Sequence, residues 1–294
     1  MQDVTFFSQG ARMSGRLWSV PGQRRPAVLV AGSWLTVKEQ MPARYAPLLA
    51  EAGFAVLTFD FRGFGASEGA PRELESAMQK AEDIRNAAAF LRTHPAVDGD
   101  RIGALAICAS AGYFAAAALG DTALGSIAMV APWLHDAEIV RQFYGGDAGV
   151  AERLATASRA RERYVRTGEL DYVPAASNVD PTAAMFWPGD ALDYYLNPRR
   201  GGIPEWGGRF ASQAWKEWLE FDPIALAPQV RLPVRLISGE QTATPSGARK
   251  FEAALSGAHD SLWLEGTQFD FYDNPHTVAA AAGHAIEHLR ATLS

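Results

Sequence analysis

Apolar runs with the length of buried strands alternate with helical segments along most of the chain. In the first part, the expected strands are 27–32, 55–61, 101–107 and 124–131, and the expected helices are 43–52, 73–93 and 109–119. Further on, expected strands at 232–239 and 260–266 alternate with expected helices at 246–255 and 276–293. This order predicts an α/β fold with a mostly parallel central sheet and helices on both faces. Functional sites of such sheets lie at the carboxyl ends of the strands.

The alternation lapses between about residues 134 and 222. This stretch contains an expected helix at 149–167 and four of the chain's eight tryptophans, namely Trp187, Trp206, Trp215 and Trp218. A long aromatic-rich segment inserted after a strand is typical of a lid over the strand ends, and packing of the tryptophans onto the body is the alternative. We therefore expect an α/β core of residues 1–133 and 223–294 and an inserted helical lid of residues 134–222.

Composition and charge argue against several classes of function. The formal net charge of −6 disfavours a nucleic-acid partner. No apolar run approaches the roughly 18 residues of a membrane span, and the first residues, MQDVTFFSQG, do not resemble a signal peptide, so we expect a cytoplasmic protein. The cysteine and histidine spacings show no metal site, and no glycine-rich cofactor motif follows a strand. We expect no cofactor, a small-molecule substrate, and a lid face compatible with a homodimer.

Four motifs carry a resemblance to a known family. They are AGSW at 31–34, FDFRGFGASEG at 59–69, DRIGALAICASAGY at 100–113 and EGTQFDFYDNP at 265–275. In this order they resemble the α/β-hydrolase family, near its dienelactone-hydrolase-like bacterial branch. The resemblance implies a nucleophile on a sharp strand-to-helix turn, with small residues two positions away on each side. That position falls on Cys108, between Ala106 and Ser110, and a shifted frame would place Ser110 at the apex.

Cys108 has two interpretations. At the amino end of the helix expected at 109–119, the helix dipole and free amides would stabilise a thiolate, which suits acyl transfer. Lone cysteines are also among the most buried residue types and pack as small apolar groups. The turn and the implied fold favour the reactive thiol.

The residues that would activate Cys108 depart from the family's pattern. The resemblance implies a histidine at the position of Gln268, and glutamine cannot take up a proton near neutral pH. Glu240 is the nearest carboxylate after the penultimate strand, where the family has its acid. His135 and Asp136 follow another strand and could serve as substitutes, or belong to a loop and a helix start. The expected site is a degenerate catalytic triad.

Substrate-binding groups are expected at the ends of neighbouring strands and in the insertion. The resemblance implies an oxyanion hole formed by the backbone N–H of Ala109 and by another near Trp34. The expected pocket residues are Ser33, Trp34, Trp133, Trp187 and Tyr195. These aromatic groups favour a sizeable apolar or aromatic ligand.

Three functions fit the sequence. The leading hypothesis is a hydrolase or acyltransferase acting on an ester, lactone or thioester carbonyl, in which Cys108 attacks with help from His135, Asp136 or Glu240. The alternative is a non-hydrolytic enzyme that uses the same pocket and oxyanion donors for addition, cyclisation, C–C bond formation or elimination. The third is an inert ligand-binding protein. Gln268 weighs against the first and Cys108 against the third.

Overall fold

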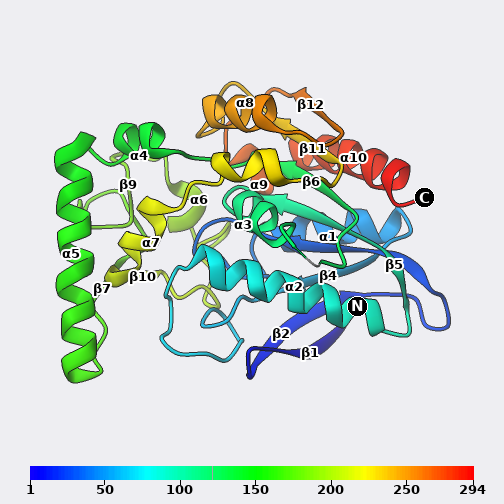
Figure 1. The fold of residues 1–294 in the computed structure, drawn as a ribbon, viewed down its shortest axis with the longest axis horizontal. Coiled ribbons are helices and arrows are strands. Elements are labelled where there is room, and N and C mark those ends of the chain that lie inside the picture. Colours follow the sequence, from blue (N-terminus) through cyan, green and yellow to red (C-terminus); the bar gives the residue numbers. More distant parts are fainter. Residues whose placement is uncertain (121) are drawn as a thin grey trace.

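An eight-stranded sheet forms the core of the computed structural model, which describes residues 1–120 and 122–294 (Figure 1). The strand order is β1-β2-β4-β3-β5-β6-β11-β12. The strands are β1 (Gln2–Ser8), β2 (Ala11–Trp18), β3 (Arg25–Ala31), β4 (Ala55–Phe59), β5 (Val97–Ile107), β6 (Ser126–Val130), β11 (Val234–Ser238) and β12 (His259–Trp263). The six strands from β4 to β12 pair in parallel, and β1 and β2 add an antiparallel hairpin. The predicted α/β fold with a mostly parallel sheet is confirmed.

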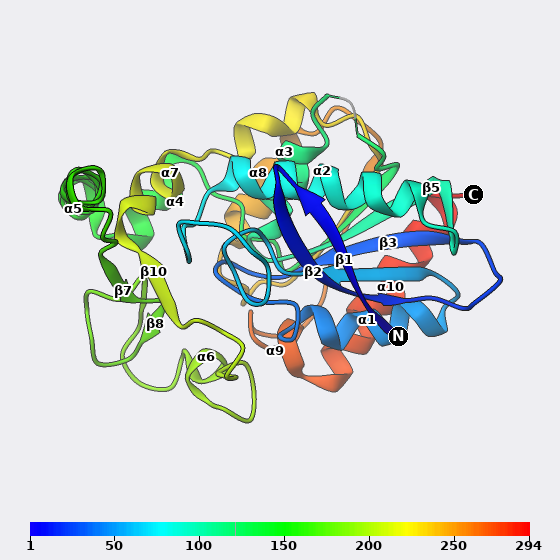
Figure 2. The same cartoon turned by 90° about the horizontal axis from the view of Figure 1, so that it is seen from below.

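Helices cover both faces of this sheet. They are α1 (Pro42–Glu51), α2 (Ala77–Thr93), α3 (Ser110–Ala117), α8 (Pro245–Ala254), the short α9 (Asp270–Asp273) and α10 (Pro275–Thr292). Figure 2 shows α1 and α10 on one face and α2, α3 and α8 on the other. Because both faces are covered, every residue of β4 and β6 is buried, which explains why their sequences are almost entirely apolar.

Several elements are shorter than the sequence predicts, and for two of them side chains explain the difference. Helix α2 begins at residue 77, because the Ser76 hydroxyl caps its first turn by accepting the N–H of Gln79. Strand β4 ends at residue 59, because the next side chain, Asp60, accepts the N–H groups of Lys38 and Ala66 at 2.8 and 2.9 Å and holds the chain in a turn. Side-chain bonds to the backbone therefore decide both boundaries.

The segment between β6 and β11 carries a second group of elements. They are α4 (Ala137–Phe143), α5 (Gly146–Thr167), β7 (Tyr172–Pro174), β8 (Ala176–Ser177), β9 (Met185–Phe186), α6 (Asp193–Leu196), β10 (Arg209–Ala211), the 3₁₀ turn η1 (Ser212–Ala214), α7 (Trp215–Glu220) and the 3₁₀ turn η2 (Ile224–Gln229). Figure 1 shows α4, α5 and α7 together at one end of the molecule, with α5 outermost. The described helices include none with the length and apolar character needed to cross a membrane.

Candidate active site

Cys108 lies at the apex of the sharp turn between β5 and α3. Its φ is +60°, in the left-handed region that residues other than glycine rarely adopt. Its N–H donates to the Val130 carbonyl of β6 at 3.0 Å, which ties the turn to the neighbouring strand. Ser110 instead begins α3, and its buried hydroxyl accepts the N–H of Ile107 at 2.8 Å. Of the two possible frames, the structure has Cys108 at the apex.

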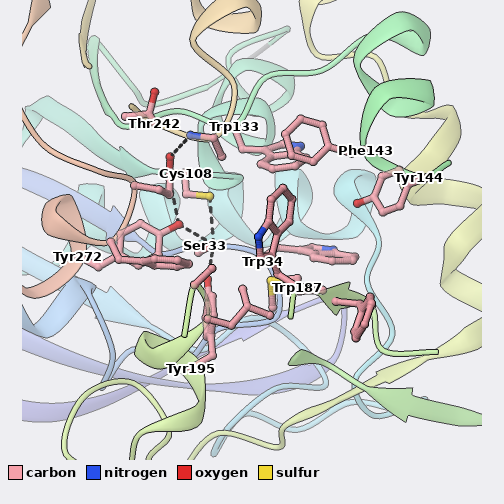
Figure 3. Close-up of a pocket in the computed structure, with 18 of the residues that line it drawn as sticks. Ser33, Trp34, Cys108, Trp133, Phe143, Tyr144, Trp187, Tyr195, Thr242 and Tyr272 are labelled. Carbon is pink, nitrogen blue, oxygen red and sulfur yellow. Dashed lines mark hydrogen bonds between the residues drawn. The ribbon is translucent and has the colours of Figure 1, made fainter. Parts of the chain in front are cut away.

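The Cys108 sulfur is surrounded by hydrogen-bond donors (Figure 3). The Ser33 hydroxyl donates to it at 3.1 Å. The backbone N–H groups of Ala109 and Trp34 also face the sulfur, and the Tyr272 hydroxyl lies beside it with its proton directed to Ser33 at 3.2 Å. Burial raises the pKa of the Cys108 thiol above its ordinary value, and these four neighbouring groups oppose that rise. The resting group is therefore a thiol, in surroundings that stabilise negative charge on or beside the sulfur.

Ser33 connects the sulfur to two tyrosines. Its hydroxyl accepts from Tyr195 of α6 at 3.0 Å and from Tyr272 of α9 at 3.2 Å. Burial raises the pKa of both phenols well above the ordinary value, so both are protonated at neutral pH. The predicted pocket residues Ser33 and Tyr195, which lie far apart in sequence, are thus in direct contact.

Gln268 lines the same pocket without bonding to Cys108 among the hydrogen bonds of the described residues. Its amide nitrogen donates to the Ala131 carbonyl at 2.9 Å and to the Tyr272 hydroxyl at 3.1 Å. Its amide oxygen accepts the N–H of Ala243 at 2.9 Å. Tyr272 was not singled out from the sequence, although its position four residues after Gln268 places both on one face of a helical turn.

A cavity of about 410 Å³ opens beside the sulfur. Its walls are formed by Ser33, Trp34, Cys108, Trp133, Phe143, Tyr144, Ala184, Met185, Phe186, Trp187, Ala191, Leu192, Tyr195, Trp218, Thr242, Ala243, Gln268, Phe269 and Tyr272. All five pocket residues expected from the sequence are among them. In the part of the chain that the structure describes, the wall has no Asp, Glu, His, Lys or Arg side chain. The cavity therefore fits an uncharged, largely apolar ligand.

His135 and Asp136 do not join Cys108 on the cavity wall. The His135 ring accepts from Trp133 Nε1 at 2.9 Å and bonds to the Trp218 carbonyl at 3.1 Å, so both ring nitrogens are occupied. Burial lowers the pKa of His135 to about 4, which keeps the ring neutral. Asp136 caps α4 and pairs with Lys250 at 2.7 Å. The expectation that these two residues assist Cys108 is corrected: one packs the wall from behind and the other begins a helix.

Glu240 also lies outside the cavity. Its side chain is 66% exposed and forms an ion pair with Arg249 on α8. The backbone position after β11 matches the expectation, but the side chain points to solvent. Glu240 is therefore corrected from a candidate catalytic acid to a surface residue.

The loop that carries Trp34 is held in a strained conformation by buried polar groups. Leu35 has a φ of +63°. Its N–H donates to Glu75 at 3.3 Å, and its carbonyl accepts from Trp206 Nε1 at 2.9 Å. Glu75 is in turn paired with the buried Lys80 at 2.8 Å. These contacts position the Trp34 N–H that faces the sulfur, and they could not be predicted from the sequence because they join distant segments.

The chain is a member of the alpha/beta hydrolase family, whose model matches residues 27–285. It is 31% identical to the uncharacterized protein YcjY of Escherichia coli K12 over 83% of this chain and 81% of that protein. It is 28% identical to the polyketide transferase claH of Penicillium crustosum, over 73% of this chain and 71% of the relative. The solved structure of DcsB in complex with its substrate analogue has the same fold, with a TM-score of 0.85, 20% identity and 99% coverage of both chains.

Proposed function

We propose that this protein is an acyl-transferring enzyme that acts on the carbonyl group of a thioester, with Cys108 as the nucleophile. The observation that carries the proposal is the position of Cys108, at the apex of a left-handed turn with the N–H groups of Ala109 and Trp34 facing its sulfur. Two such donors beside a nucleophile are the arrangement that stabilises the oxyanion of a tetrahedral intermediate.

Acylation forms one bond to sulfur and breaks another. The Cys108 sulfur attacks the carbonyl carbon, and the resulting oxyanion accepts the N–H groups of Ala109 and Trp34. Collapse of this intermediate expels the substrate's thiolate, which takes up the proton that the Cys108 thiol has lost. The products are an acylated Cys108 and a free thiol.

The uncharged cavity wall favours a thioester over an oxygen ester or lactone. Thiol–thioester exchange needs no strong general base on the enzyme, because the departing thiolate has a proton affinity close to that of the attacking Cys108 thiolate. An alkoxide leaving group is far more basic and needs a general acid, such as the histidine of a catalytic triad. Neither an imidazole nor a carboxylate lies on the described wall.

The same lack of a base favours transfer of the acyl group over hydrolysis. Water must lose a proton to attack the acylated Cys108, and general bases typically contribute about 10²- to 10⁴-fold to such steps. Without one, the acyl-enzyme persists until a better nucleophile, brought by a second substrate, takes the acyl group. The transferase activity in the name of the relative claH is consistent with this outcome.

The acyl group is proposed to be apolar or aromatic. Trp133, Phe143, Trp187 and Trp218 share the cavity wall with the polar cluster around Ser33. Trp187 is 57% exposed, so it stands at the mouth of the cavity. We propose that the insertion, residues 134–222, acts as a lid whose aromatic side chains exclude water from the acylated sulfur.

A second candidate is a non-hydrolytic enzyme that does not form a covalent intermediate. The specific observation in its favour is that burial raises the pKa of the Cys108 thiol, which leaves little thiolate at neutral pH. In this case the N–H groups of Ala109 and Trp34 would polarise a bound carbonyl compound for addition, cyclisation, C–C bond formation or elimination.

Intact-protein mass spectrometry separates the two. The protein is mixed with the benzoyl thioester of N-acetylcysteamine, and Cys108→Ala is the matched control. A benzoyl adduct on the wild type that is absent from Cys108→Ala, together with release of free N-acetylcysteamine, supports covalent transfer. Binding of the thioester without an adduct at any time point would contradict it and leave non-covalent catalysis or simple ligand binding.

A further inference from the structure

The orientation of the Gln268 amide is determined by two backbone groups of opposite polarity. The Ala131 carbonyl can only accept, so it faces the amide nitrogen at 2.9 Å. The N–H of Ala243 can only donate, so it faces the amide oxygen at 2.9 Å. The second hydrogen of the Gln268 nitrogen then points to the Tyr272 hydroxyl, 3.1 Å away.

This orientation sets the direction of the next two hydrogen bonds. Because Tyr272 accepts from Gln268, its own proton is free for Ser33, at 3.2 Å. Ser33 also accepts from Tyr195 at 3.0 Å, so both acceptor positions of its hydroxyl are occupied. The single Ser33 proton is left for the Cys108 sulfur, at 3.1 Å. Figure 3 shows Ser33 between Cys108 and the two tyrosines.

We propose that Gln268 is a positioning residue that directs a chain of donors, through Tyr272 and Ser33, onto the Cys108 sulfur, so that this site stabilises its thiolate with donors instead of removing its proton with a base. The inference rests on the proposed function for its purpose, since a stabilised thiolate is the attacking species in acyl transfer. Its geometry is independent of any substrate.

The groups around the sulfur do not themselves titrate in the range of the test, so the ionisation of Cys108 reports on the chain of hydrogen-bond donors. Four phenols lie near enough to the sulfur for their charges to interact with it: Tyr272 on α9, Tyr195 on α6, Tyr113 on α3 and Tyr144 after α4. Burial raises the pKa of each, so none changes charge as the thiol titrates below about pH 11. The wall presents no carboxylate, imidazole, ammonium or guanidinium group among the described residues.

The test is the pH dependence of Cys108 alkylation by iodoacetamide, from about pH 6 to about pH 11, with the rate constants of wild type and variants also compared at equal pH. Tyr272→Phe removes one donor of the chain. Gln268→Met removes the amide that orients these donors and keeps a side chain of similar size. Each is expected to move the midpoint of the alkylation profile upward by about one to two pH units, the shift that corresponds to a lost hydrogen bond to a charged acceptor.

Tyr45→Phe is the matched control. The buried Tyr45 hydroxyl donates to the Phe271 carbonyl at 2.7 Å, on the same helix α9 and one residue before Tyr272, and Tyr45 is not on the cavity wall. Its loss disturbs the packing of α9 without touching the chain of donors. The midpoint of Tyr45→Phe is therefore expected to equal that of the wild type.

Equal midpoints for the wild type, Tyr272→Phe and Gln268→Met, with all three folded, would overturn the inference, as would a wild-type thiol that stays unreactive over the whole range. Alkylation requires no acyl substrate, so it separates this inference from the proposed function. Shifted midpoints without a benzoyl adduct would retain the donor chain and reject acyl transfer. A benzoyl adduct with unshifted midpoints would retain acyl transfer and reject the donor chain.

Discussion

The Ser33 hydroxyl donates a hydrogen bond to the Cys108 sulfur across 3.1 Å, although 75 residues separate them in the chain. Ser33 follows β3 and Cys108 follows β5, and these two strands are parallel neighbours. Their carboxyl ends therefore lie side by side, which places a polar loop residue against the apex of the turn.

Ser33→Ala is expected to slow alkylation of Cys108 at neutral pH by roughly tenfold or more. The substitution removes a donor to the thiolate, and such bonds to charged groups contribute about 1.5–3 kcal/mol. It also leaves the hydroxyls of Tyr195 and Tyr272 without their acceptor. The second-order rate constant with iodoacetamide measures the effect, and an unchanged rate would show that the Ser33 bond does not stabilise the thiolate.

The wild-type thiol is expected to react slowly at pH 7 and faster as the pH rises. Burial raises the pKa of Cys108 above its ordinary value, so only a small fraction is thiolate at neutral pH. In that regime the alkylation rate grows about tenfold for each pH unit. A rate that is already constant between about pH 6 and pH 8 would contradict this prediction, because it would require a thiolate at rest.

The position of Cys108 could be predicted from the sequence, whereas its partners could not. Ala106 and Ser110 leave space for a sharp turn, and this local requirement is visible in ten residues. Glu240 and His135 do follow strands at the carboxyl edge of the sheet, as expected. The direction of a side chain is decided by distant groups, here Arg249 for Glu240 and the Trp218 carbonyl for His135. A sequence pattern does not contain those contacts.

Trp206→Phe is expected to slow acylation more than alkylation. The Trp206 indole donates to the Leu35 carbonyl and helps to hold the left-handed backbone that presents the Trp34 N–H. Loss of this bond costs about 1 kcal/mol, and a loosened Trp34 N–H stabilises the oxyanion less well. Single-turnover benzoylation and iodoacetamide alkylation are measured on the same samples. An equal slowing of both reactions would point to a general change of the pocket instead.

His135 is expected to make the free energy of unfolding depend on pH below neutrality. Burial lowers its pKa to about 4, against about 6.5 in the unfolded chain. Between these values the unfolded chain binds more protons, so stability rises as the pH increases from about 4 to about 6.5, and up to about 3 kcal/mol is lost on acidification. Urea unfolding at several pH values measures this slope. In His135→Gln this contribution to the pH dependence of the unfolding free energy should vanish. A slope identical to that of the wild type would assign the pH dependence to other groups.

Gln268→His is expected to leave the acyl-enzyme long-lived. A histidine becomes an effective base in a triad when a carboxylate orients its ring and stabilises the imidazolium. No carboxylate lies on the described cavity wall, and Glu240 is exposed and paired with Arg249. In the wild type, the Gln268 oxygen accepts the N–H of Ala243. In Gln268→His this N–H would meet a ring nitrogen instead and occupy the lone pair that a base needs.

The decay of the benzoyl adduct is followed by mass spectrometry in the wild type and in Gln268→His. The decay rate of the variant is expected to exceed that of the wild type by at most about tenfold, below the range of general base catalysis. An increase of about a hundredfold or more, within the range of general base catalysis, would show that the substituted histidine reaches the acylated sulfur without a carboxylate partner.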